Sequence, residues 1–272
     1  MAEAGDDILV LGATSLIGRY LAPLLGRRAL AVSRAPPAGA PGRWLAADLE
    51  ADPQLPPAAT VVSLMPLWLL APLLPRLLAG GMTRLVAFSS TSRFTKQDSA
   101  EPSERDVAER LAMAEAAVMM SPAAWTILRP TLIYAEGQDG NVSRLAGIAR
   151  RIGLLPLAGE GKGLRQPVHA EDLAAAVPAI LASPKTTGRA YDLPGGETLS
   201  YRAMCERVFE GLGKRPRIVA VPPWLWRLAF SLVRPRGATA SMGDRMAEDL
   251  VFDPRPARAD FGWAPRGFRP KF

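Results

Sequence analysis

The chain has 272 residues, which is enough for one large domain or for a domain with an appended lobe. Its apolar content of 49% provides for a sizeable core and excludes a disordered protein. The single cysteine, Cys205, excludes an internal disulfide and favours a reducing, cytoplasmic compartment. The acidic first residues differ from the basic start that is typical of a signal peptide.

The net charge of +7 is distributed unevenly along the chain. Residues 211–272 carry 12 Lys or Arg against 5 Asp or Glu, whereas residues 1–210 carry 21 of each sign. This excess of positive charge favours contact with an anionic ligand or surface, and solubility explains it equally well. We recognise no nucleic-acid-binding module and no internal repeat, so nucleic acid is not an expected partner.

A short apolar run followed by a glycine-bounded turn opens the chain. Residues 8–11 predict a buried strand, and apolar residues recur at helical spacing from Leu16 to Leu25. A strand that turns directly into a helix presents free N–H groups that bind phosphate. The candidates for binding the pyrophosphate of a dinucleotide are Gly12, Ala13, Thr14, Ser15, Leu16, Ile17 and Gly18. In the alternative interpretation, the turn only packs a helix on a sheet.

The second predicted strand, residues 29–32, ends in Ser33 and Arg34. In dinucleotide-binding folds an acidic residue near this point holds the ribose of NAD, whereas an arginine accommodates the 2′-phosphate of NADP. No Asp or Glu occurs between Asp7 and Asp48, so Arg34, with Ser33 as a hydrogen-bond donor, favours NADP over NAD. Alternatively, Arg34 only opens the proline-rich loop that follows.

Further strands are predicted at residues 44–46, 60–64, 84–88 and 125–128, and again at 190–193. Prolines in the uncharged stretch 53–75 argue against a membrane-spanning helix there. In open α/β sheets, ligands bind at the carboxyl ends of the strands. Leu64, Met65 and Pro66, which follow one such strand, are therefore expected to lie along the cofactor.

The spacing Gly-x-x-Ser-x-x-Gly at residues 12–18 resembles the glycine turn of the NAD(P)-dependent epimerase/dehydratase family, the extended short-chain dehydrogenase/reductases. Ser15 stands where the middle glycine usually does. Segments 129–137, 166–173 and 261–265 resemble later segments of the family in the same order. The resemblance implies a Rossmann-type, doubly wound parallel sheet with a smaller C-terminal α/β substrate lobe. It places all of residues 1–272 in one NAD(P)-binding unit, with the lobe formed mainly by about 136–165 and 190–272.

The resemblance also implies roles for individual residues. Asp48 and Leu49 match a pair that meets the adenine ring, although a carboxylate at a turn is an equally good interpretation of Asp48. Ser89 and Thr91 lie in a serine-rich run in which a hydroxyl, by register that of Thr91, holds the substrate oxygen. Pro130 and Leu132 match residues that line the nicotinamide pocket.

The family's acid–base pair, Tyr-x-x-x-Lys, is missing. Counting back from Glu115, its positions fall on Val107 and Leu111, which belong to an apolar helix face. The standard proton relay is therefore absent, and a donor has to be improvised from Thr91 with water, from Tyr134 or from Glu136. We take Thr91 and Tyr134 as the catalytic candidates, while Tyr134 is also a structural residue of its motif.

His169 is the only histidine. Without a cluster of Cys, His or Asp it does not indicate a metal site, and none is predicted. We expect His169 to be a structural hydrogen-bonding residue where a helix begins.

An apolar, tryptophan-rich segment flanked by arginine runs from Pro222 to Arg234. It suits a helix lying on an anionic membrane, here through Trp224–Arg234, or a lid over an apolar substrate. The alternative is a core helix of the lobe.

Two functions follow from these features. The first is a NADP-dependent oxidoreductase or epimerase-like enzyme acting on an unknown small or apolar molecule, and we favour it narrowly. The second is a non-catalytic NADP-binding sensor or membrane-proximal assembly factor. The resemblance also allows a homodimer.

Overall fold

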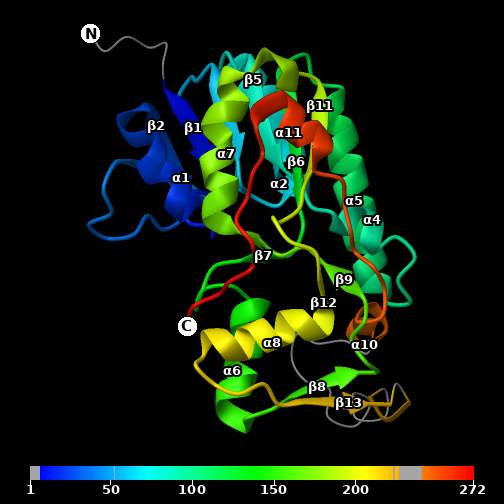
Figure 1. The fold of residues 1–272 in the computed structure, drawn as a ribbon. Helices are drawn as coiled ribbons and strands as arrows, with labels where there is room; N and C mark the ends of the chain where they lie inside the picture. Colours follow the sequence, from blue (N-terminus) through cyan, green and yellow to red (C-terminus); the bar gives the residue numbers. More distant parts are fainter. Residues whose placement is uncertain (1–6, 52, 223, 227–240) are drawn as a thin grey trace.

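A seven-stranded parallel sheet forms the centre of the molecule (Figure 1). The computed structural model describes residues 7–51, 53–222, 224–226 and 241–272. The strand order is β11-β6-β5-β4-β1-β2-β3, so the winding direction reverses beside β1. The strands are β1 (Ile8–Leu11), β2 (Ala29–Ser33), β3 (Arg43–Ala46), β4 (Thr60–Ser63), β5 (Arg84–Phe88), β6 (Ala124–Pro130) and β11 (Arg189–Leu193). The predicted Rossmann-type, doubly wound fold is confirmed.

Helices cover both faces of this sheet, which is why its central strands are continuous apolar runs. All four residues of β1 are buried. One face packs against α1 (Gly18–Leu25) and α7 (Ala170–Ala182), and the other against α2 (Leu67–Leu70), α3 (Leu74–Ala79) and α5 (Pro102–Met119). The short α4 (Ser92–Thr95) lies against α5. Among the described residues, we find no helix with the length and hydropathy needed to cross a membrane.

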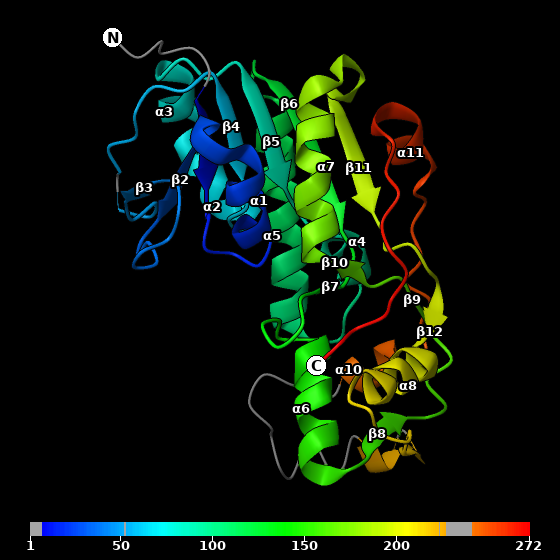
Figure 2. The same ribbon diagram turned by 60° about the vertical axis from the view of Figure 1, so that its left-hand side comes forward.

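A smaller lobe lies beyond the carboxyl ends of the strands. Figure 2 shows α6 running from the sheet toward the far end of this lobe. Three small two-stranded sheets connect or complete it: β7 with β10, β9 with β12, and β8 with β13. The elements are β7 (Ile133–Tyr134), α6 (Val142–Ile152), β8 (Leu155–Ala158), β9 (Leu164–Arg165), β10 (Val168–His169), β12 (Leu199–Ser200), α8 (Tyr201–Gly211), β13 (Ile218–Val221) and α10 (Ser241–Arg245).

The boundary of the lobe differs from the predicted one at two places. Strand β11 pairs with β6 in the large sheet, and α11 (Arg255–Phe261) packs on β11 and α7. The Tyr191 hydroxyl donates to Asp260 over 2.7 Å, and the Trp263 indole donates to the Pro194 carbonyl over 3.0 Å. Both bonds hold α11 on the main body, so the range 190–272 is shared between the sheet layer and the lobe.

Replacing Tyr191 by Phe is expected to lower the free energy of unfolding by about 2 kcal/mol, because the buried Asp260 contact is a hydrogen bond to a charged group. Urea denaturation measures this change. Tyr20→Phe, on α1, is the control and is expected to change the free energy of unfolding by less than about 0.5 kcal/mol. Equal stability of Tyr191→Phe and the unmodified protein would contradict the assignment of α11 to the main body.

Candidate functional site

The turn between β1 and α1 depends on two glycines. Gly12 has φ +73°, and a Cβ there would lie 3.0 Å from the Met65 amide nitrogen. A Cβ on Gly18 would overlap the carbonyl oxygen of Ala13. Only glycine therefore allows the helix to begin this close to the turn and the turn to lie this close to the end of β4.

Free amide groups line the outer side of the same turn. The Ser15 amide donates to the Gly12 carbonyl over 3.0 Å, and the Ser15 hydroxyl accepts from the Gly18 amide over 3.2 Å. The N–H groups of Leu16 and Ile17 donate to no acceptor in the part of the chain that the structure describes. Helix α1 begins at Gly18 rather than at Leu16, so these two residues belong to the turn. The arrangement fits an anion such as a pyrophosphate.

The predicted cofactor residues at the ends of β2 and β4 meet this turn. The Ala13 amide donates to Val32, and the Thr14 and Ser33 hydroxyls lie 3.1 Å apart. The Leu64 amide donates to the Leu11 carbonyl over 2.9 Å, which places Leu64, Met65 and Pro66 beside the turn. Next to Ser33, Arg34 is exposed and has no ion pair with any described carboxylate.

Asp48 and Leu49 lie at the end of β3 and have local roles. Asp48 accepts from the Glu50 amide over 3.1 Å, as a turn carboxylate does. Leu49 is buried in the core on the α5 side of the sheet. These contacts support the turn interpretation of Asp48.

Ser89, Thr91 and Pro130 are brought together where β5 and β6 end. The Thr91 amide and hydroxyl both donate to the Pro130 carbonyl over 3.2 Å, and Thr91 is buried. The Ser89 hydroxyl donates to Glu115 over 2.6 Å. Both hydroxyl protons are thus committed to protein acceptors.

Tyr134 belongs to the core of the lobe. Its side chain is 1% exposed and packs edge-on against the rings of His169 and Phe268, with centroids 4.9 and 5.0 Å away. Burial and the nearby Glu136 carboxylate raise the pKa of the phenol above its usual value. Leu132 packs against the same cluster. The contacts of Tyr134 match the structural alternative for this residue.

The helix face that lacks the acid–base pair packs against the sheet. Leu111, Ala114 and Val118 are buried in the core, and Val107 is partly buried beside them. This confirms the apolar face predicted for α5.

A buried ion cluster lies at the end of the same face, and the sequence did not predict it. Glu115 is fully buried and accepts from Arg129 Nε over 2.9 Å and Nη2 over 2.7 Å, while Arg93 also donates to it. Arg129 lies 3.6 Å from Asp192 on β11. Burial alone would raise the pKa of Glu115, but hydrogen bonds from Arg129 and Ser89 outweigh it and lower the pKa below its usual value.

His169 is the N-cap of α7, as expected of a residue where a helix begins. Its Nδ1 accepts from the Glu171 amide over 3.2 Å, so the proton resides on Nε2, which lies 2.9 Å from Glu136. The Glu136 side chain is 28% exposed. Within the described ranges, no three His, Cys, Asp or Glu side chains converge as metal ligands would.

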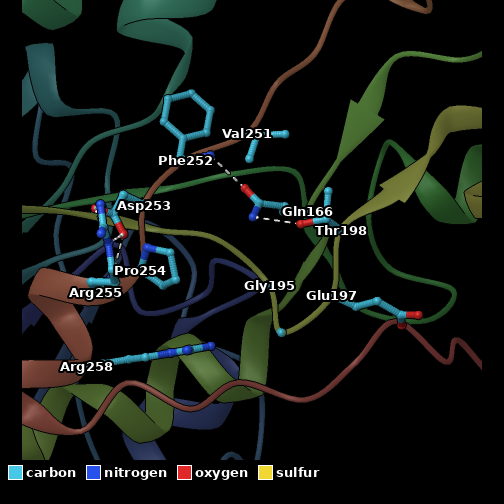
Figure 3. A pocket seen from close by; sticks show the side chains of 11 residues that line it. Gln166, Gly195, Glu197, Thr198, Val251, Phe252, Asp253, Pro254, Arg255 and Arg258 are labelled. Carbon is cyan, nitrogen blue, oxygen red and sulfur yellow. Dashed lines mark hydrogen bonds and ion pairs between the residues drawn. The ribbon is translucent and has the colours of Figure 1, made fainter.

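A cavity of about 530 Å³ lies away from the glycine turn, beside the segment that leads into α11 (Figure 3). Gln166 crosses it, donating to Thr198 over 3.1 Å and accepting from the Phe252 amide over 2.8 Å. Arg255, at its rim, pairs with Asp253. None of the residues predicted for the cofactor lines this cavity, which is bounded by Gln166, Gly195, Gly196, Glu197, Thr198, Val251, Phe252, Asp253, Pro254, Arg255 and Arg258.

Solved structures share this architecture over almost the whole chain. MoeE5, solved with UDP-glucuronic acid and NAD, matches with a TM-score of 0.70 and 23% identity, covering 96% of this chain and 94% of that one. TunA, an NAD-dependent NDP-hexosamine 5,6-dehydratase of tunicamycin biosynthesis, matches at 0.71 and 16%, covering 97% and 94%. The chain has the fold of the short-chain dehydrogenase/reductase superfamily. No family model matches it.

A curated relative shares a part of the sequence. The mitochondrial NADH dehydrogenase [ubiquinone] 1 alpha subcomplex subunit 9 of Arabidopsis thaliana is 32% identical over 127 residues, which are 46% of this chain. The match covers 30% of that protein, so the chain spans less than a third of the length of the relative.

Glu115→Gln is expected to destabilise the protein by about 3 kcal/mol at pH 7, because it removes the fully buried carboxylate that pairs with the partly buried Arg93 and Arg129. Since folding lowers the pKa of Glu115, its contribution is complete above the unfolded pKa of about 4.3 and is lost as the pH falls through the folded pKa. Denaturation at pH 7 and pH 3 should show a smaller difference at pH 3. The exposed Glu109→Gln is the control, and a pH-independent difference would contradict the assignment.

Proposed function

We propose that the chain binds a nicotinamide dinucleotide at the turn of residues 12–18. The observation that carries the proposal is the close approach of Gly18 to the Ala13 carbonyl, which leaves the Leu16 and Ile17 amides free at the start of α1. A pyrophosphate needs such free donors at a helix N-terminus. The presence of NAD in MoeE5, which has the same fold, supports this choice of ligand.

We further propose that NADP is preferred over NAD. Arg34 is exposed directly after β2, beside the Thr14–Ser33 contact that joins this strand end to the turn. Its guanidinium is free to pair with a 2′-phosphate, and Asp48, the next acidic residue along the chain, has a local turn bond. NAD remains the second choice of cofactor.

Arg34→Ala is expected to weaken NADPH binding about tenfold or more, close to 1.4 kcal/mol, and to leave NADH binding unchanged, because only NADPH carries the 2′-phosphate. Fluorescence titration with both nucleotides measures the two affinities. Arg27→Ala, an exposed arginine on the preceding turn, is the control. Similar affinities for both nucleotides, unaltered in Arg34→Ala, would exclude the preference, and no binding of either would exclude the site.

We infer that the protein binds the nucleotide but does not catalyse the reaction of the family it resembles. The positions of the acid–base pair are Val107 and Leu111, which pack on the sheet. Thr91 donates to Pro130, and Tyr134 is enclosed by aromatic rings. A sensor or a membrane-proximal assembly factor needs a bound nucleotide and no proton donor. The name of the curated relative, a subunit of a NADH dehydrogenase, supports a role within an assembly.

An enzyme is the second candidate, and Glu136 is the observation that favours it. Its partly exposed carboxylate lies 2.9 Å from His169 Nε2. A bound nicotinamide would supply or accept a hydride. Glu136, oriented by the His169 Nε2–H bond, would carry a proton taken up from solvent and donate it to the oxygen of a small or apolar carbonyl substrate as the hydride is added to the carbonyl carbon.

The two candidates make opposite predictions for NADPH oxidation with panels of carbonyl compounds and sugar nucleotides. The non-catalytic function predicts that NADPH is oxidised no faster with these compounds than without them. The enzyme predicts oxidation that Glu136→Gln lowers at least a hundredfold, the usual contribution of a general acid. Glu171→Gln is the matched control, because Glu171 also faces His169 and is bound by Arg266.

A further inference from the structure

The far end of the lobe exposes large apolar side chains on neighbouring segments. Ile152, at the end of α6, is 61% exposed, and Val219 on β13 is 48% exposed. Trp224 and Leu225, which follow β13 directly, are 67% and 40% exposed. Single exposed apolar residues are ordinary on a protein surface. Here four of them occur on three connected segments, and this requires an explanation.

The backbone brings these segments side by side. Strand β8 begins three residues after Ile152 and pairs along its length with β13, from Leu155 with Ile218 to Ala158 with Val221. The Leu155 amide also donates to the carbonyl of Arg217 over 2.9 Å. Figure 1 shows β8 and β13 together at the end of the molecule opposite α11. The end of α6 therefore lies beside the start of β13, and Trp224 and Leu225 follow the other end of the same strand.

Five cations directly precede Ile152 and β13 along the chain. They are Arg150, Arg151, Lys214, Arg215 and Arg217, all exposed. The Lys214 ammonium donates to the Arg150 carbonyl over 3.4 Å, which joins the loop after α8 to the end of α6. In the ranges that the structure describes, none of the five forms an ion pair. Exposed arginines elsewhere do, as Arg266 does with Glu171.

We propose that this surface, formed by the five cations with Ile152, Val219, Trp224 and Leu225, docks on an anionic lipid bilayer. Exposed cations that form no ion pair among the described residues match a continuous layer of lipid phosphates. An exposed tryptophan beside aliphatic side chains suits the interface between headgroups and acyl chains. The lipid phosphates pair with the basic side chains, and Trp224 and Leu225 enter the interface.

The tryptophan-rich segment could be a core helix of the lobe or a helix on a membrane, and its described residues show features of both. Trp226 packs against the core of the lobe beside Ala158 and Met246, as a core residue does, whereas Trp224 and Leu225 face solvent. The rest of that segment, residues 227–234, lies outside the described residues. The surface shares no residue with the turn of residues 12–18, so it stands independently of the proposed nucleotide site.

Co-sedimentation of the full chain with vesicles tests the proposal. Vesicles of phosphatidylcholine with one quarter phosphatidylglycerol are expected to pellet the protein, and pure phosphatidylcholine vesicles are expected to pellet at least tenfold less. Raising the salt from 0.1 to 0.5 M should reduce the pelleted fraction, because exposed charges are screened. Equal pelleting by both vesicles, or no pelleting by either, would overturn the proposal.

Two pairs of substitutions separate the apolar and the charged contributions. Trp224→Ala with Leu225→Ala, and Arg215→Glu with Arg217→Glu, are each expected to lower vesicle affinity at least tenfold. The matched controls are Met113→Ala on α5 with Met120→Ala at its C-cap, 68% and 85% exposed, and Arg27→Glu with Arg28→Glu.

An NADPH titration of every variant shows that it is folded and keeps the nucleotide result separate from the lipid result. A similar loss in the control pairs, or full vesicle binding by the two surface variants, would overturn the assignment of this surface. Retention on heparin without any vesicle binding would assign the cations to a soluble polyanion and likewise overturn it.

Discussion

The close approach of α1 to the turn before it is the constraint on which the site depends. Gly18 lies where any side chain would overlap the Ala13 carbonyl, and Gly12 lies against the end of β4. Because both positions lack a Cβ, α1 begins in close contact with the turn, and the amides of Leu16 and Ile17 in that turn have no acceptor among the described residues. The same placement lets α1 pack along α7, whose N-cap, His169, contacts the ring of Tyr20. The geometry of the turn thus sets both the position of these free amides and the packing of α1 on α7.

The site keeps the sheet and helices of its fold. At the positions of the family's acid–base pair it has apolar side chains that pack on the sheet, and an ion cluster with a buried carboxylate lies beside them. Helix α5 presents Leu111 to the sheet where the family's lysine would stand, and Glu115, one turn further, holds Arg129 and Arg93. The ion pairs join α5 to α4 through Arg93 and to β6 and β11 through Arg129 and Asp192, and the Ser89 hydrogen bond to Glu115 adds the end of β5. In a scaffold held this way, the hydroxyls of Ser89 and Thr91 already have acceptors beside the proposed nucleotide site. This favours retention of a nucleotide over its turnover.

Local sequence patterns predicted those parts of the fold that depend on residues close together in the chain. The apolar runs of β1, β4 and β5 identified buried strands, and the lone His169 was assigned correctly as a helix-capping residue. The apolar spacing from Leu16 did not give the start of α1, which lies at Gly18, because Leu16 and Ile17 belong to the turn that the Ser15 hydroxyl closes onto the Gly18 amide. The place of β11 was wrong because strand pairing is decided by tertiary contacts.

The spacing of residues likewise did not predict the Glu115–Arg129 pair, although a carboxylate on an apolar helix face indicates a cation partner nearby.

The two proposed surfaces, one for a nucleotide and one for lipid, are connected through the loop before α6 and through α6 itself. The loop before α6 contacts α1 through Gln138 and Arg19, and it caps α6 through Asp139, which accepts from the Ser143 amide over 3.1 Å. Helix α6, which Figure 2 shows running away from the sheet, has the exposed Arg150, Arg151 and Ile152 in its last turn. The loop that contacts α1 also caps α6. It therefore sets the orientation of α6 and, with it, the orientation of the basic surface. A protein docked on a bilayer through that surface would present its nucleotide corner at a defined distance from the membrane.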